Sequence, residues 1–142
     1  MTIKLQIYKC TVCRNLVQIL QEGDGNLVCC GQEMELQNVQ YDTTELGEKH
    51  TPKIVYKDGH KSINVLEHPM SHEHYIQFIE AFSDDKNEVY IKFFKPEDKP
   101  EADISFFSTE QSFLVHFKQA SAGLNSSNSR LILSAASINT CS

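Results

Sequence analysis

Four cysteines in the first 30 residues have the types and spacing of a metal site. Cys10 and Cys13 form a C-x-x-C pair in "YKCTVC", and Cys29 and Cys30 are adjacent in "LVCCG". Two pairs of thiolates can surround one tetrahedral ion, either zinc or iron. A disulfide between the adjacent cysteines is strained, since neighbouring α-carbons are only about 3.8 Å apart. The pattern predicts a four-cysteine metal site, and the simpler alternative is four free thiols in a small strand-rich domain.

Histidines are the candidate ligands in the later part of the chain. His50 lies in "EKHTP", and His68 and His74 lie at the two ends of "HPMSHEH". Neutral imidazole is the commonest metal-binding side chain, and the Pro-Met turn lets two histidines converge from the ends of one loop. For any single histidine, a solvated surface position is the simpler interpretation. That interpretation suits His60 and His72 best.

Lysines are concentrated just after residue 48. Residues 49–61 contain four lysines and a single acidic residue, Asp58, which gives a local charge of +3 in a chain of net charge −6. The lysines are Lys49, Lys53, Lys57 and Lys61. Their spacing of four fits one face of a strand, because alternate strand residues point the same way. Such a patch would attract a small anion. The alternative is a solvated strand face without a function.

The elements that must hold these residues are short strands. "PKIVYKDGHKSINV" predicts two strands around the Asp58-Gly59 turn, and Gly23 and Gly25 suit a turn that returns the second cysteine pair to the first. "HYIQFIEAF", "EVYIKFF", "ADISFF" and "SFLVHF" are further strand candidates, the first with Ile76 on one face and Ile79 on the other. Strands this short, with frequent turns, predict an all-β protein containing an antiparallel sandwich.

Composition separates three parts of the chain. A cysteine-containing module at 1–37 precedes a sandwich domain at 38–118. The range 119–142 is rich in Ser, Ala and Asn and contains a single charge, Arg130. Such a composition predicts an irregular tail, in which "RLILS" is the one candidate for a short strand.

Charge and hydropathy restrict the partners and the compartment. The net charge of −6 argues against nucleic acid and anionic membranes as partners. The start "MTIKLQIYKC" lacks the apolar run of a signal peptide, so we expect a reducing cytoplasm. Disulfides are disfavoured in that compartment, which strengthens the prediction of a metal site.

Five motifs in order resemble one family, the desulfoferrodoxins, which are two-iron superoxide reductases. "YKCTVC", "LVCCGQEM", "EKHTP", "HPM" and "HEHYI" occur in family order and spacing. The resemblance extends from about Leu5 to Val115. It implies a small desulforedoxin-like knuckle followed by an immunoglobulin-like β-sandwich, and a homodimer formed through the N-terminal domain.

The resemblance also implies roles for individual residues. The four cysteines, Cys10, Cys13, Cys29 and Cys30, would hold a rubredoxin-like iron centre. His50, His68 and His74 match three of the four histidines around a second, mononuclear Fe(II)/Fe(III) site, where zinc is a possible substitute. Glu48 matches the carboxylate that closes the sixth position after oxidation, and Lys49 matches the lysine that steers superoxide and helps to deliver protons. A rubredoxin-like protein would return the iron to Fe(II).

The chain departs from the family pattern after "STEQSFLV". The family places its axial cysteine and fourth histidine in a C-N-x-H-G motif there, and residues 116–142 contain no such motif. Three explanations remain open: a shift of reading frame near Val115, a divergent form with an incomplete histidine site, or substitution by His116 and Cys141. The departure predicts weak superoxide reductase activity or none. The sequence therefore carries two hypotheses, a superoxide reductase and a non-enzymatic iron-binding or electron-transfer protein.

Overall fold

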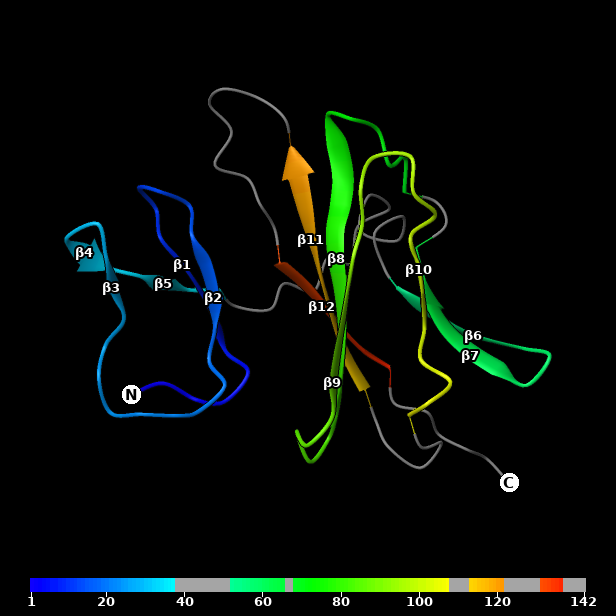
Figure 1. Cartoon of the computed structure of the whole chain (residues 1–142), viewed down its shortest axis with the longest axis horizontal. Helices are drawn as coiled ribbons and strands as arrows, with labels where there is room; N and C mark the ends of the chain where they lie inside the picture. The colour runs from blue at the N-terminus through cyan, green and yellow to red at the C-terminus, as the bar shows by residue number, and fades with distance from the viewer. Residues whose placement is uncertain (38–51, 66–67, 108–112, 122–130, 137–142) are drawn as a thin grey trace. The chain divides into compact units, whose positions relative to one another are not determined.

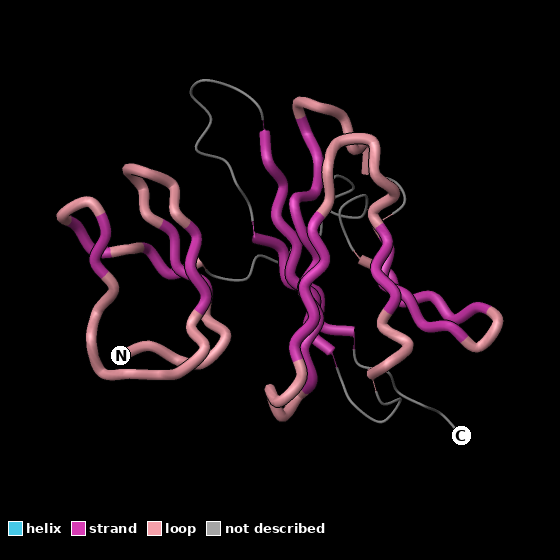
Figure 2. The backbone as a smooth tube through the Cα atoms, viewed as in Figure 1, coloured by secondary structure: helices cyan, strands magenta, loops and turns pink. Residues whose placement is uncertain are grey.

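The computed structural model describes residues 1–37, 52–65 and 68–107 in full, and residues 113–121 and 131–136 as backbone strands. Strands and loops account for all of these residues, as the all-β prediction requires (Figure 2). The chain divides into two compact units, Met1–Asn38 and Val39–Ser142. Within the described residues, no helix is long and apolar enough to span a membrane.

The N-terminal unit consists of two small antiparallel sheets (Figure 1). One sheet has the order β2-β1-β5, and the other is the hairpin β3-β4. The strands are β1 (Ile7–Lys9), β2 (Leu16–Gln18), β3 (Val28–Cys29), β4 (Gln32–Glu33) and β5 (Glu35–Leu36). Few apolar side chains are buried in this unit, chiefly Leu5, Ile7 and Ile19, together with Cys10, which is fully buried. A core of this size rarely holds a domain together without a disulfide or a metal.

The second unit contains two larger antiparallel sheets, of orders β10-β7-β6 and β12-β11-β8-β9 (Figure 1). The strands are β6 (Lys53–Lys57), β7 (His60–Asn64), β8 (His74–Ser83), β9 (Val89–Phe93), β10 (Glu101–Asp103), β11 (Phe113–Ser121) and β12 (Leu131–Ala136). Side chains from both sheets share one hydrophobic core, which makes the unit a β-sandwich. The core residues are Ile63, Val65, Met70, Ile76, Ile79, Ala81, Phe94, Ala102, Ile104 and Phe107.

The β6-β7 hairpin has the turn that the sequence predicts. Asp58 and Gly59 form its two-residue loop, and both have positive φ angles, 51° and 77°. Two left-handed residues make a turn whose twist matches that of the flanking strands. This turn also corrects the interpretation of the lysines. Lys57 pairs with His60 across the hairpin, so Lys61 points to the opposite face and is buried, with 3% of its surface exposed.

Strand β8 departs from simple alternation. Its register with β11 shifts between Ile76 and Phe78, which is a β-bulge at Gln77. A bulge adds one residue to one strand and changes which residues face each side. As a result Ile76 and Ile79 both lie in the core, although strict alternation predicts opposite faces for them.

Strands also occur inside the range whose composition predicts an irregular tail. β11 continues to Ser121, and β12 pairs with β11 along its whole length, from Leu131 to Ala136. This strand includes most of the apolar segment "RLILS". The sandwich therefore uses residues beyond 118.

Candidate metal centres

Two hairpins present the four cysteines. Cys10 and Cys13 lie in the loop between β1 and β2, which is closed by the Cys10 N–H donating to the Asn15 carbonyl at 2.9 Å. Arg14 has a positive φ of 67° and donates its N–H to the Cys10 carbonyl at 3.0 Å. This loop folds the C-x-x-C segment back on itself and brings its two sulfurs to one side.

The β3-β4 hairpin explains how the adjacent cysteines, Cys29 and Cys30, both reach the cluster. Cys29 is the last residue of β3, and Cys30 and Gly31 form the two-residue loop, with φ angles of 52° and 76°. Residues with positive φ at both loop positions are typical of the tight turns that join antiparallel strands. The turn places one cysteine in a strand and its neighbour at the turn, so the two side chains approach the same point from different directions.

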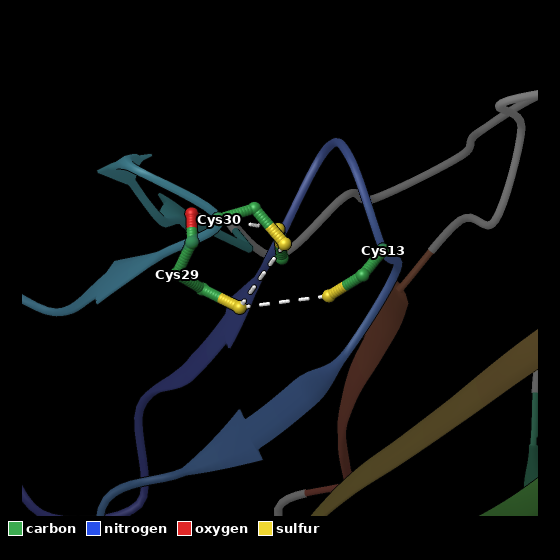
Figure 3. Close-up of side chains that lie close together, drawn as sticks. Cys13, Cys29 and Cys30 are labelled. Atoms are coloured by element: carbon green, nitrogen blue, oxygen red, sulfur yellow. Dashed lines mark hydrogen bonds between the residues drawn. The ribbon is translucent and has the colours of Figure 1, made fainter.

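All four sulfurs lie within 4.8 Å of one another. Figure 3 labels Cys13, Cys29 and Cys30, whose side chains point toward one another. Sγ of Cys29 lies 3.5 Å from Sγ of Cys13 and 3.9 Å from Sγ of Cys30. A tetrahedral ion with metal–sulfur bonds of about 2.3 Å requires sulfur–sulfur separations of about 3.8 Å. The donor set and its geometry therefore fit a single tetrahedral ion.

The surroundings of the cluster stabilise one cysteine as a thiolate and disfavour the ionisation of its neighbours. Hydrogen bonds from the backbone N–H groups of Cys13 and Val12 stabilise the Cys10 thiolate and lower its pKa to about 6. Contact with the sulfurs of Cys13 and Cys10 raises the pKa of Cys29 to about 12, and contact with Cys13 also raises the pKa of Cys30. A cation offsets this crowding of negative charge, and its binding releases protons.

Asn15 is a neighbour of the cluster that the cysteine spacing does not reveal. Its side-chain amide lies 4.0 Å from the Cys29 sulfur, and its carbonyl closes the C-x-x-C loop. Hydrogen bonds to ligand sulfurs tune the electronic properties of thiolate-bound iron. Its place two residues after Cys13 is the sequence signal for this position.

His68 and His74 lie together, as the loop between them predicts. Their ring centroids are 4.7 Å apart, with planes inclined by 32°. His68 is buried, with 5% of its surface exposed, while His74 is half-buried at the start of β8. Two imidazoles this close can supply two nitrogen ligands to one ion, so their role as metal ligands stays a prediction.

The other candidates have different positions. His60 is exposed, and its Nδ1 lies 3.6 Å from Oδ2 of Asp103. His72 is also exposed, and its Nε2 lies 3.5 Å from Oε1 of Glu97. Both fit the simpler interpretation of surface histidines. Glu48, Lys49 and His50 lie outside the described residues, so their part in the site stays a prediction.

Strand register separates His116 from the histidine pair. His116 pairs with Glu80, which is six residues along β8 from His74, or about 20 Å at about 3.3 Å per residue. One ion cannot bind both histidines at that separation, so the substitution of His116 for the missing histidine is wrong. Cys141 lies outside the described residues. The residue of β11 that pairs with His74 is Ser121.

Comparison with known proteins adds two family matches. Residues 2–37 match the family described as "Desulfoferrodoxin, N-terminal domain", and residues 42–122 match the family described as "Desulfoferrodoxin". The second match continues past Val115, where the motif resemblance ends. It stops within one residue of the end of β11.

Named relatives match different lengths of the chain. The chain is 46% identical over 101 residues to the desulfoferrodoxin of Desulfarculus baarsii, covering 70% of this chain and 78% of the relative. It is 41% identical over 116 residues to the desulfoferrodoxin homolog of Archaeoglobus fulgidus, covering 79% and 89%. The desulforedoxin of Megalodesulfovibrio gigas is 54% identical over 28 residues, which is 20% of this chain and 76% of that protein.

A solved structure shares the fold. The crystal structure of the superoxide reductase from Treponema pallidum aligns with a TM-score of 0.56 and 15% identity, covering 84% of this chain and 93% of that one. Its low identity makes it evidence of the fold alone. The two family matches and the identities above 40% decide the lineage: this chain belongs to the desulfoferrodoxin family.

Proposed function

We propose that this chain is a superoxide reductase that converts superoxide to hydrogen peroxide at a mononuclear iron site containing His50, His68 and His74. The observation that carries the proposal is the pair of imidazoles 4.7 Å apart within a sandwich of desulfoferrodoxin sequence. The structural neighbour from Treponema pallidum is itself described as a superoxide reductase. A ferrous ion held by these histidines would supply the one electron that the reaction needs, and two protons complete the peroxide.

The residues of the chain have separate tasks in this proposal. Cys10, Cys13, Cys29 and Cys30 hold a second iron in the N-terminal unit, where the sulfur geometry suits a tetrahedral ion. Lys49 attracts the substrate anion, an effect on the association rate that decreases with salt. Glu48 closes the open position of the oxidised centre. A rubredoxin-like protein supplies electrons from outside.

A second candidate function follows from the sequence after β11. Residues 116–142 contain no Cys-Asn-x-His motif, so this range lacks the segment that carries the axial thiolate and the fourth histidine in the family pattern. Without the thiolate, the iron loses the electron donation that assists release of peroxide. In this second candidate, the chain is a non-enzymatic iron-binding protein whose four-cysteine centre transfers electrons.

Stopped-flow mixing of the iron-loaded full chain with superoxide separates the two candidates. We expect slow reduction that is lost in His68→Ala and kept in His72→Ala, because His72 is an exposed residue of the same loop. Iron analysis of each variant distinguishes loss of the ion from loss of reactivity. A rate equal in wild type and His68→Ala would exclude the enzyme and leave the second candidate.

A further inference from the structure

The loop between His68 and His74 contains a methionine whose conformation is unusual. Met70 has a positive φ of 48° and is buried, with 5% of its surface exposed. A bulky residue in the left-handed region is strained, and such strain persists only where the surroundings fix it. The family motif "HPM" includes this residue, and the proposed chemistry gives it no task.

Three hydrogen bonds fix Met70. Its N–H donates to Nδ1 of His68 at 3.3 Å, and its carbonyl accepts from the N–H of Glu97 at 2.8 Å. Its sulfur accepts from the N–H of Ile76 at 3.4 Å. Ile76 lies in β8, two residues after His74. The pairing of β8 with β9 begins two residues later, at Phe78. Met70 therefore connects the ring of one histidine to the strand that carries the other.

Ser71 completes the loop from the side of His74. The N–H of His74 donates to Oγ of Ser71 at 3.1 Å, and the Ser71 hydroxyl donates to the His74 carbonyl at 3.2 Å. These reciprocal bonds set the backbone at His74, where β8 begins. The contact of the Met70 N–H with Nδ1 constrains the orientation of the His68 ring.

We propose that Met70 and Ser71 are positioning residues that hold the imidazoles of His68 and His74 in a mutual arrangement suited to one ion. This inference rests on the proposed histidine site. A pair of imidazoles held in place binds an ion more tightly than two mobile ones, since the cost of ordering them is met during folding. Neighbours that orient metal ligands typically change affinity by about 10- to 100-fold when they are replaced.

Co²⁺ binding to the full chain tests this role without reference to turnover. The four-cysteine site is first filled with Zn²⁺, and Co²⁺ is then titrated while its visible absorption is recorded. Met70→Leu keeps the apolar volume and removes the sulfur acceptor. We expect it to weaken Co²⁺ binding about tenfold and to shift the absorption bands. Met34→Leu, the same change in the N-terminal unit, should match wild type.

Each outcome of the titration decides a separate point. If Met70→Leu binds Co²⁺ with the affinity and spectrum of wild type, the positioning role is wrong. If wild type and His68→Ala bind equally, the histidine site itself fails, and the inference fails with it. If Met70→Leu does not fold, Ser71→Ala decides, because it removes only the bonds to His74; unchanged binding by that folded variant would overturn the inference.

Discussion

At the scale of single residues, the four-cysteine site depends on backbone conformation as much as on sulfur. Cys30 and Gly31 both have positive φ angles, and this is what lets two adjacent cysteines face one centre. Glycine adopts this conformation without strain, whereas a residue with a Cβ does so at a cost. The glycine after the cysteine pair is therefore part of the metal site, although it offers no ligand.

Replacing this glycine tests the dependence. Gly31→Ala should destabilise the metal-loaded N-terminal unit by about 1–2 kcal/mol, because Gly31 has a φ of 76°. Urea unfolding followed by thiolate-to-metal absorption measures the change. Gly25→Ala is the matched control in the same unit, since Gly25 is not left-handed and an added Cβ meets no atom within 4 Å. Equal stabilities of the two variants would contradict the prediction.

Asp85 is a residue whose ionisation supports the turn between β8 and β9. The Ser83 hydroxyl donates to Oδ1 at 2.5 Å, and the Asn87 N–H donates to Oδ1 at 3.1 Å. These bonds favour the carboxylate and lower the pKa of Asp85, the Ser83 bond most strongly. A pKa lowered by folding contributes stability above the unfolded value of about 3.9, and this contribution is lost as the pH decreases through the folded value.

Acid unfolding of Asp85→Asn measures this contribution. We expect a lower thermal midpoint at neutral pH and a smaller decrease of that midpoint between about pH 5 and pH 3. Asp84→Asn removes the same charge from the same turn and serves as the control. If the thermal midpoint of Asp85→Asn decreases with pH as steeply as that of the wild type, the hydrogen-bonded carboxylate does not contribute to the stability of the turn.

At the scale of elements, β8 and β11 determine which residues accompany the histidine pair. His74 pairs with Ser121, and Tyr75 pairs with Ala120. Directly opposite residues share a face, with Cβ atoms about 4.5–5.5 Å apart, and successive residues alternate between faces. If His74 binds an ion as we propose, position 121 is therefore the place in β11 from which an added ligand would reach it.

A thiol introduced at this position tests the register and the histidine site together. Ser121→Cys should add a thiolate-to-metal charge-transfer band when Co²⁺ binds to the full chain with Zn²⁺ in the four-cysteine site. Ala120→Cys is the matched control, because the residue at 120 is on the other face of the strand. The same band in both variants, or in neither, would contradict this placement.

At the scale of the whole molecule, the two units have different sources of stability. The sandwich has a hydrophobic core shared by two sheets, whereas the N-terminal unit buries few apolar side chains around a cysteine cluster. A structural metal contributes on the order of 10 kcal/mol to folding, enough to decide whether a unit of this size folds. We therefore expect metal loss to affect the N-terminal unit before the sandwich.

Removal of the metal from the full chain with a chelator tests whether the N-terminal unit unfolds first. In ¹H–¹⁵N spectra, signals from residues 1–37 should collapse toward unfolded positions while signals of the sandwich keep their dispersion. Cys10→Ser should show the same selective loss before any chelator is added, because Cys10 is the fully buried member of the cluster. Simultaneous unfolding of both units would mean that their stabilities are not separate.

The sequence by itself determined the four-cysteine cluster, the all-β class, the hairpin at Asp58-Gly59 and the meeting of His68 with His74. These features are local, or follow from residue types that admit few conformations, so spacing and turn chemistry are enough to predict them. Tertiary structure alone decided the rest: the bulge at Gln77, the burial of Lys61 and the pairing of Ser121 with His74. The bulge and the Ser121 pairing depend on the register of β8 with β11, and the burial of Lys61 depends on its packing near Phe107. Both are contacts between segments far apart in the chain, which local spacing does not predict.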